Sequence, residues 1–126
     1  MLDELRAGVL DSIAESAGNY RDAGGARDFA AYCRELNGRV VLDPRVQRHI
    51  VWAQYSLASD ASFNEFDLIV CRHVLDAFAP ALARRAHKLF YESLCEFGLL
   101  ALGQAPITLF HYQALALPQG IFRRSS

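Results

Sequence analysis

The fold is decided by the stretch FDLIVCRHVLDAF, which occupies residues 66–78. Its first part, up to Val70, is a short apolar run of the kind that packs on a pleated surface, which predicts a strand. The chain turns polar at Arg72 and His73, and a helical pattern follows. Apolar residues recur on one face of that helix, at Leu82, Ala86, Leu89, Phe90 and Leu94, and charged residues occupy the other face.

Gly98 lies where a left-handed residue would cap this helix, so we expect the helix to end there. A second apolar run, residues 99–102, begins at once. A strand, a helix and a second strand in close succession form a right-handed βαβ unit, whose two strands are parallel. The fold class predicted from this unit is α/β, built on a doubly wound sheet.

The N-terminal part of the chain is predicted to be mainly helical. Residues 2–23 carry a narrow apolar stripe at helical spacing, although Gly8 is a weak point at which the helix can divide into two pieces. Gly24-Gly25 is a strong stop signal. Residues 28–35 then have the pattern of a short second helix.

The middle of the chain favours short strands. Asn37-Gly38 is a turn dipeptide that leads into a strand at residues 39–42. Asp43-Pro44 predicts the start of a short helix, because aspartate caps a helix and proline fits its first position. The apolar run at residues 49–55 is a further strand candidate.

The C-terminal part is predicted to form an antiparallel hairpin. Residues 103–108 form a loop that contains a proline, and residues 109–117 alternate as a strand does. A turn at residues 118–120 would bring residues 121–124 back beside that strand.

Composition is that of a small globular domain. At 126 residues and 52% hydrophobic, the chain is long enough for one domain with a real core, and its net charge of −1 gives no basic field that would attract nucleic acid. No apolar run reaches the roughly 18 residues of a membrane span, and the acidic, amphipathic N-terminus is unlike a signal peptide. We expect buried free thiols at Cys33, Cys71 and Cys95, as in a protein of the reducing cytoplasm.

Several linked motifs resemble the CheR-type chemotaxis methyltransferases. Residues 64–75 are similar to the family segment in which an F-D pair and an apolar run lead to C-R-N-V-L. The other similar segments are residues 19–25 with Phe29 and Tyr32 (the family's N-Y…G-G stretch and aromatic pair), residues 50–57 (its V-F-x-Q-H-N-L strand) and residues 89–103. The resemblance runs from about residue 5 to residue 124.

Members of this family transfer a methyl group from S-adenosylmethionine to glutamate side chains of chemoreceptors, in the signal transduction of bacterial chemotaxis. The resemblance covers only the C-terminal part of the family's domain. It therefore implies a partial Rossmann-like methyltransferase fold with the third to seventh strands of the family's sheet, a C-terminal antiparallel hairpin and no first two strands. Residues 1–126 would be one truncated CheR-like domain, with a helical segment at 1–38 and a sheet-forming region at 39–126.

Three departures from the family's pattern argue against catalysis by this chain. The family's glycine-rich loop, which lets the backbone approach the cofactor, and the acid that holds the ribose lie upstream of the matched part. The asparagine of the family's Q-H-N-L strand is Ser56 here. The asparagine after its C-R pair is His73, and its active-site tyrosine is Ala77, which offers neither ring nor hydroxyl.

The resemblance leaves five positions as remnants of a cofactor-binding wall: Ser56, Leu57, Arg72, His73 and Val74. It implies no catalytic residue in this chain, and it names S-adenosylmethionine as the family's cofactor, not bound by this chain alone. The leading interpretation is a non-catalytic pseudoenzyme that serves as an interaction or vestigial module in signalling. The alternative is the C-terminal half of an active protein-glutamate O-methyltransferase that needs an upstream glycine-rich segment.

The family's strand order, 3-2-1-4-5-7-6, implies an open sheet edge in this chain. Without the first two strands, the strand at residues 66–71 would lose a neighbour, and unpaired backbone groups on an apolar edge invite another strand. We hypothesise that residues 49–55 pair beside residues 66–71, or that a second copy of the chain or an upstream methyltransferase half fills the gap.

Other residues carry less specific signals. His73 has Asp76 as its nearest acidic partner in sequence, and a polar helix-start residue is the simpler interpretation. No metal site is expected, because His49, His87 and His111 share no ligand spacing. Arg84, Arg85 and Lys88 form either a solvated helix face or a docking surface for an acidic partner, for which a bacterial signalling protein is one candidate.

Overall fold

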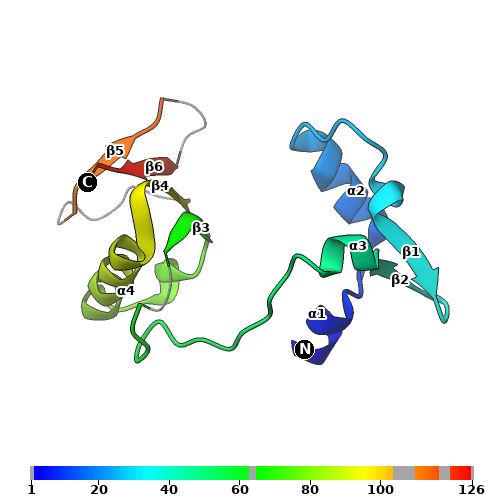
Figure 1. The fold of residues 1–126 in the computed structure, drawn as a ribbon, viewed down its shortest axis with the longest axis horizontal. Helices are drawn as coiled ribbons and strands as arrows, with labels where there is room; N and C mark the ends of the chain where they lie inside the picture. The colour runs from blue at the N-terminus through cyan, green and yellow to red at the C-terminus, as the bar shows by residue number, and fades with distance from the viewer. Residues whose placement is uncertain (1, 63–64, 104–109, 117–119, 126) are drawn as a thin grey trace. The chain divides into compact units, whose positions relative to one another are not determined.

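The computed structural model describes residues 2–62, 65–103, 110–116 and 120–125 (Figure 1). It divides into two compact units, Met1–Gln54 and Tyr55–Ser126, each with its own sheet. The division of the chain into a helical segment at residues 1–38 and a sheet-forming region at residues 39–126 stays a prediction. The assignment of the whole chain to one domain remains a prediction.

The first unit combines short helices with a two-stranded antiparallel sheet. Its elements are α1 (Leu2–Ala7), α2 (Ile13–Asp22), the 3-10 helix η1 (Phe29–Tyr32), β1 (Cys33–Leu36), β2 (Arg39–Leu42) and α3 (Pro44–Gln47). The predicted helix break at Gly8 is confirmed. This residue has a φ of 69°, which suits glycine, and its neighbour Val9 bridges to Val41 of β2.

Side-chain caps begin two of the α-helices of this unit. The Ser12 hydroxyl accepts a hydrogen bond from the Glu15 amide at the start of α2. The Asp43 carboxylate accepts one from the Arg45 amide at 2.8 Å, and proline follows it as the first residue of α3, as predicted. Each cap satisfies an amide that has no partner within its helix.

The turn between β1 and β2 explains one wrong prediction. Asn37 and Gly38 both have positive φ, as a tight hairpin turn requires, so the predicted turn is confirmed. This turn brings residues 33–36 opposite β2, and they pair with it as a strand. The helix predicted at residues 28–35 therefore ends at Tyr32, because ladder pairing replaces the helical bonds beyond it.

The second unit contains a four-stranded mixed sheet. Its elements are β3 (Phe66–Cys71), the 3-10 helix η2 (Leu75–Ala77), α4 (Pro80–Ser93), β4 (Leu94–Leu102), β5 (Tyr112–Ala114) and β6 (Ile121–Arg124). The strand order is β3-β4-β6-β5. The parallel pairing of β3 with β4 across α4 confirms the predicted βαβ unit, and the antiparallel pairing of β5 with β6 confirms the C-terminal hairpin.

Parts of the predicted hairpin cannot be compared with the fold. The expected strand at residues 109–117 is confirmed for Tyr112–Ala114, while residues 109 and 117 lie outside the described residues. The same holds for residues 104–108 of the predicted loop and for residues 118 and 119 of the predicted turn.

The helix end predicted at Gly98 is wrong. α4 ends at Ser93, and β4 begins at Leu94 and runs through Gly98. Gly98 lies beside a β-bulge and does not cap a helix. The register of β4 with β3 shifts between Phe66 and Leu68, and Phe97 adopts a φ of 62°. A Cβ on Gly98 would lie 3.1 Å from the carbonyl oxygen of Phe66, so this glycine permits close approach of two backbones.

The core of the second unit lies between α4 and one face of the sheet. Its buried members are Leu75, Ala86, Phe90, Leu94, Leu100, Leu102 and Phe122. Leu94 and Leu100 are the largest of the fully buried side chains. The expected burial of the cysteines is only partly met, since all three free thiols are half-buried.

The strand predicted at residues 49–55 is wrong. These residues have no strand structure, and Val51 is 92% exposed. An apolar run becomes a strand only where a partner completes its ladder, and none of the described residues pairs with this one. The hypothesis that it pairs beside residues 66–71 is therefore also wrong: among the described residues, β3 has β4 as its only ladder partner.

Candidate functional site

The candidate site lies where β3 and β4 end. A cavity of about 200 Å³ opens there, lined by Cys71, His73, Leu75, Asp76, Leu102 and Gly103. Both strands of this parallel pair point their carboxyl ends toward it, and this edge of an open α/β sheet is where such folds bind ligands. The cavity is thus in the right place for a ligand.

Backbone geometry presents His73 at the mouth of this cavity. The residue has a φ of 62°, a left-handed conformation that is uncommon outside glycine. Its Nδ1 lies 3.6 Å from an Asp76 carboxylate oxygen, and both side chains are largely exposed. An exposed pair of this kind orients the imidazole but contributes little to stability.

Arg72 and His73 flank the segment that leaves β4. A Cβ placed on Gly103 would lie 4.0 Å from Arg72 Nε and from His73 Cε1, which is ordinary contact distance. Val74, the next residue, is 46% exposed and precedes η2. The structure therefore gathers three of the five predicted cofactor-wall residues at one edge of the sheet.

The other two predicted residues lie in a turn before β3. The Ser56 amide donates to the Asp60 carboxylate at 2.7 Å, and the Ser56 carbonyl accepts from the Asp60 amide at 3.0 Å. Leu57 packs against the core and lines a second cavity. This second cavity shares no lining residue with the one at His73.

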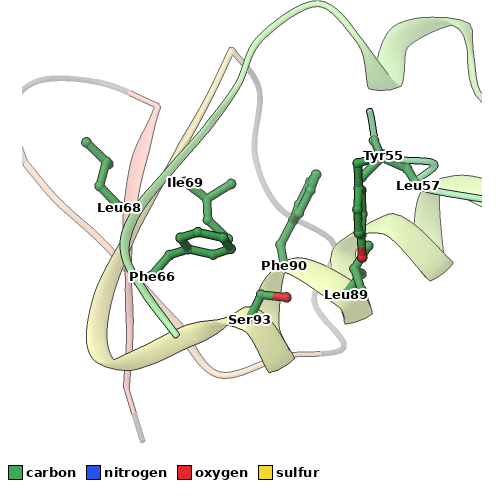
Figure 2. Close-up of a pocket in the computed structure, with 8 residues that line it drawn as sticks. All are labelled: Tyr55, Leu57, Phe66, Leu68, Ile69, Leu89, Phe90 and Ser93. Atoms are coloured by element: carbon green, nitrogen blue, oxygen red, sulfur yellow. The ribbon is translucent and has the colours of Figure 1, made fainter. Parts of the chain in front are cut away.

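The second cavity is apolar and has a volume of about 300 Å³ (Figure 2). Its lining residues are Tyr55, Leu57, Phe66, Leu68, Ile69, Leu89, Phe90 and Ser93. Figure 2 shows Phe66 and Ile69 extending from β3 toward Phe90 of α4, while Leu68 extends to the opposite side of the strand. The cavity therefore lies against the α4 side of β3.

Sequence reasoning missed several residues of these cavities. Cys71 is the last residue of β3 and Gly103 follows the last residue of β4, so both line the cavity at the carboxyl ends of these parallel strands. The predicted βαβ unit already implied that these two ends lie side by side. Burial raises the pKa of the Cys71 thiol, so this thiol is a weak nucleophile. The basic residues of α4 lie on its exposed face, where Arg85 donates to the Asp60 carbonyl and Lys88 pairs with Glu92 at 3.7 Å.

The described residues of this chain do not by themselves fit S-adenosylmethionine. Pockets that enclose a ligand of drug-like size measure about 300–1,000 Å³, more than the cavity at His73 offers. The described strand-to-helix junctions contain no glycine: β2 leads into α3 through Asp43, and β3 leads into η2 through residues 72–74. A cofactor bound at the cavity beside His73 would need further residues to enclose it.

Comparison with known proteins agrees with the motifs. The "Putative methyltransferase Cher3" of Pseudomonas putida strain KT2440 is 40% identical over 131 residues, which cover 98% of this chain and 48% of that protein. An "Uncharacterized 104.1 kDa protein in hypE 3'region" of Rhodobacter capsulatus is 33% identical over 66 residues, or 52% of this chain and 7% of that protein. The chain thus spans about half the length of the Pseudomonas relative. No model of a protein family matches it.

The fold and the cavity together define a mixed α/β protein that is compatible with a partial methyltransferase fold. The match to the Pseudomonas relative extends over nearly the whole chain, including the segments that carry the motifs. The match is consistent with a C-terminal fragment of a CheR-type methyltransferase.

Two features are absent from the described residues. No helix in them is both long and apolar enough to cross a membrane. Within the same ranges, no three His, Cys, Asp or Glu side chains gather closely enough to hold a metal ion.

Proposed function

We propose that this chain is the C-terminal part of a CheR-like, S-adenosylmethionine-dependent protein-glutamate methyltransferase domain, and that its 126 residues do not transfer methyl groups unaided but serve as a non-catalytic interaction or vestigial module in signalling. The observation that carries this proposal is the cavity of about 200 Å³ at the carboxyl ends of β3 and β4. It has the position of a cofactor site but less volume than a ligand of this size requires.

The order of the strands supports the assignment. The sheet runs β3-β4-β6-β5, which is the order that the family's fourth, fifth, seventh and sixth strands would take. The parallel pair comes first and the antiparallel hairpin last, as this correspondence requires. The third family strand has no counterpart in a described ladder, so the correspondence rests on these four strands.

A second candidate function is favoured by the length of the Pseudomonas relative, about half of which has no match in this chain. In that case the chain is one half of an active enzyme, and the other half brings the glycine-rich turn and the ribose-binding acid. The first candidate, a non-catalytic signalling module, is favoured instead by His73 and Ala77 at positions where the family has an amide and a tyrosine.

Calorimetric titration with S-adenosylhomocysteine tests the proposal. We expect no binding at micromolar concentrations by the folded 126-residue chain, with circular dichroism as the control for folding. Micromolar binding by this chain alone would overturn the proposal. Binding that appears only after addition of the unmatched half of the Pseudomonas relative selects the half-enzyme, whereas no binding in the mixture selects the non-catalytic module.

A further inference from the structure

The outer face of α4 carries a group of cations. Three exposed residues, Arg84, Arg85 and Lys88, make up this group, which we call the cationic face. Lys88 pairs with Glu92 at 3.7 Å, and neither arginine forms an ion pair among the described residues. α4 contains no other carboxylate, so this side of the helix is positively charged in a chain whose net charge is −1.

Helix stability does not account for the cationic face. Arg84 and Lys88 are four residues apart, a spacing at which like charges are neighbours on the helix surface and repel each other. None of the three cations lies in the last turn of α4, where the helix dipole favours positive charge. The pair of Lys88 with Glu92 is exposed at both ends and contributes little. These residues therefore suit a function outside the helix.

A hollow of about 160 Å³ lies beside the cationic face. Arg85 and Lys88 line it together with two apolar residues, Ala61 and Leu89. A cavity of about 150 Å³ holds a group of the size of benzene, so the hollow has room for one side chain of a partner. Arg85 Nη2 donates a hydrogen bond to the Asp60 carbonyl at 3.1 Å, which ties the segment before β3 to α4. A guanidinium has five N–H donors, so Arg85 keeps donors for a carboxylate.

The charges fit an acidic protein segment better than a nucleic acid. Sites that depend on phosphate contacts engage about 6–10 phosphates, whereas this face offers three cations and stands next to Glu92 and Asp60. A helix with two glutamates four residues apart presents its carboxylates at the spacing of Arg84 and Lys88, because both pairs follow the same helical repeat.

We propose that the cationic face docks an acidic helix of a partner protein, with carboxylates on Arg84 and Lys88 and one apolar side chain in the hollow. This inference goes beyond the proposed function, because the surface requires neither S-adenosylmethionine nor methyl transfer. Arg85 has a second task in it, since its bond to Asp60 holds the two walls of the hollow together.

The probe is a synthetic helical peptide of about 20 residues, long enough to be helical in water, with two glutamates four apart and a phenylalanine on the same face. It is titrated into the isotope-labelled chain and followed by nuclear magnetic resonance without any cofactor, so the outcome is independent of the titration with S-adenosylhomocysteine. We expect shift changes in α4 and residues 60–62. Arg84→Glu/Lys88→Glu should weaken binding about tenfold or more, and a peptide with alanine in place of the phenylalanine should bind about tenfold more weakly.

Arg21→Glu/Arg34→Glu is the matched control, because it makes the same change in net charge at two exposed positions of the first unit, and it should leave binding unchanged. A peptide with lysines in place of the glutamates should bind the Arg84→Glu/Lys88→Glu variant and not the unchanged chain. Circular dichroism shows whether each variant is folded. Absence of binding at about 1 mM peptide overturns the inference. An equal loss in both double variants overturns it too, as does tighter binding of duplex DNA through the same residues.

Discussion

Replacing Gly120 with alanine should separate β6 from β4. Gly120 has a φ of 79°, and a Cβ there would lie 2.3 Å from the carbonyl oxygen of Leu102. The Gly120 carbonyl also accepts a hydrogen bond from the Leu102 amide at 2.7 Å. The added methyl group would therefore meet backbone that is held in place, not a side chain that can rotate away.

Two costs determine the size of the effect. A non-glycine residue in the left-handed region costs roughly 1–2 kcal/mol. Forcing an extra carbon into a filled site costs typically 1–3 kcal/mol more. The free energy of opening β6 from the sheet should therefore fall by about 2–5 kcal/mol, a large part of the stability of a small domain.

Hydrogen exchange resolved by peptide is the suitable assay, because it reports on the two units separately. Exchange in β4 and β6 should accelerate about 30-fold or more in Gly120→Ala. Gly38→Ala is the control: Gly38 has a φ of 73° but no atom within 4 Å of the added Cβ, so it should cost only the backbone part, about 1–2 kcal/mol, and only in β1 and β2. Unchanged exchange in β4 and β6 of Gly120→Ala would refute this reasoning.

Two further substitutions test the packing of the core and the dependence of stability on pH. Leu100→Ala should destabilise the second unit by about 2–5 kcal/mol, because Leu100 is completely buried; a loss of under 1 kcal/mol in urea unfolding would contradict the packing described above. His87 is 3% exposed, and burial lowers the pKa of its imidazole below the ordinary value of 6.5. The unfolded chain therefore binds a proton that the folded chain does not, so stability is full above about pH 6.5 and falls as the pH is lowered toward the folded pKa, by at most about 1.4 kcal/mol per pH unit. His87→Gln should reduce this slope, and a slope that is unchanged in His87→Gln would contradict the assignment.

Local signals in the sequence predicted the elements that depend on near neighbours. The turn at Asn37-Gly38, the cap at Asp43 and the βαβ unit all follow from short-range patterns, and all are found. Gly98 misled the prediction because glycine serves both a helix cap and a β-bulge, and only the register between β3 and β4 distinguishes them.

Pairing over longer distances could not be predicted in the same way. Residues 49–55 have the composition of a strand, but composition does not say whether a partner exists, and they form none. The same contrast between local and long-range signals applies to the candidate site. His73 could be singled out as the end of a strand, whereas Gly103 becomes a lining residue only through the parallel pairing of β3 with β4.

The position of β4 has a consequence for the order in which the protein is made. β4 pairs with β3, which precedes it in the chain, and with β6, which follows it. Phe122 of β6 belongs to the same core as Leu100 and pairs with it across the sheet. A nascent chain can therefore assemble β3, α4 and β4 while the side of Leu100 that Phe122 will cover is still exposed to water. The core of the second unit closes only after β6 has been translated.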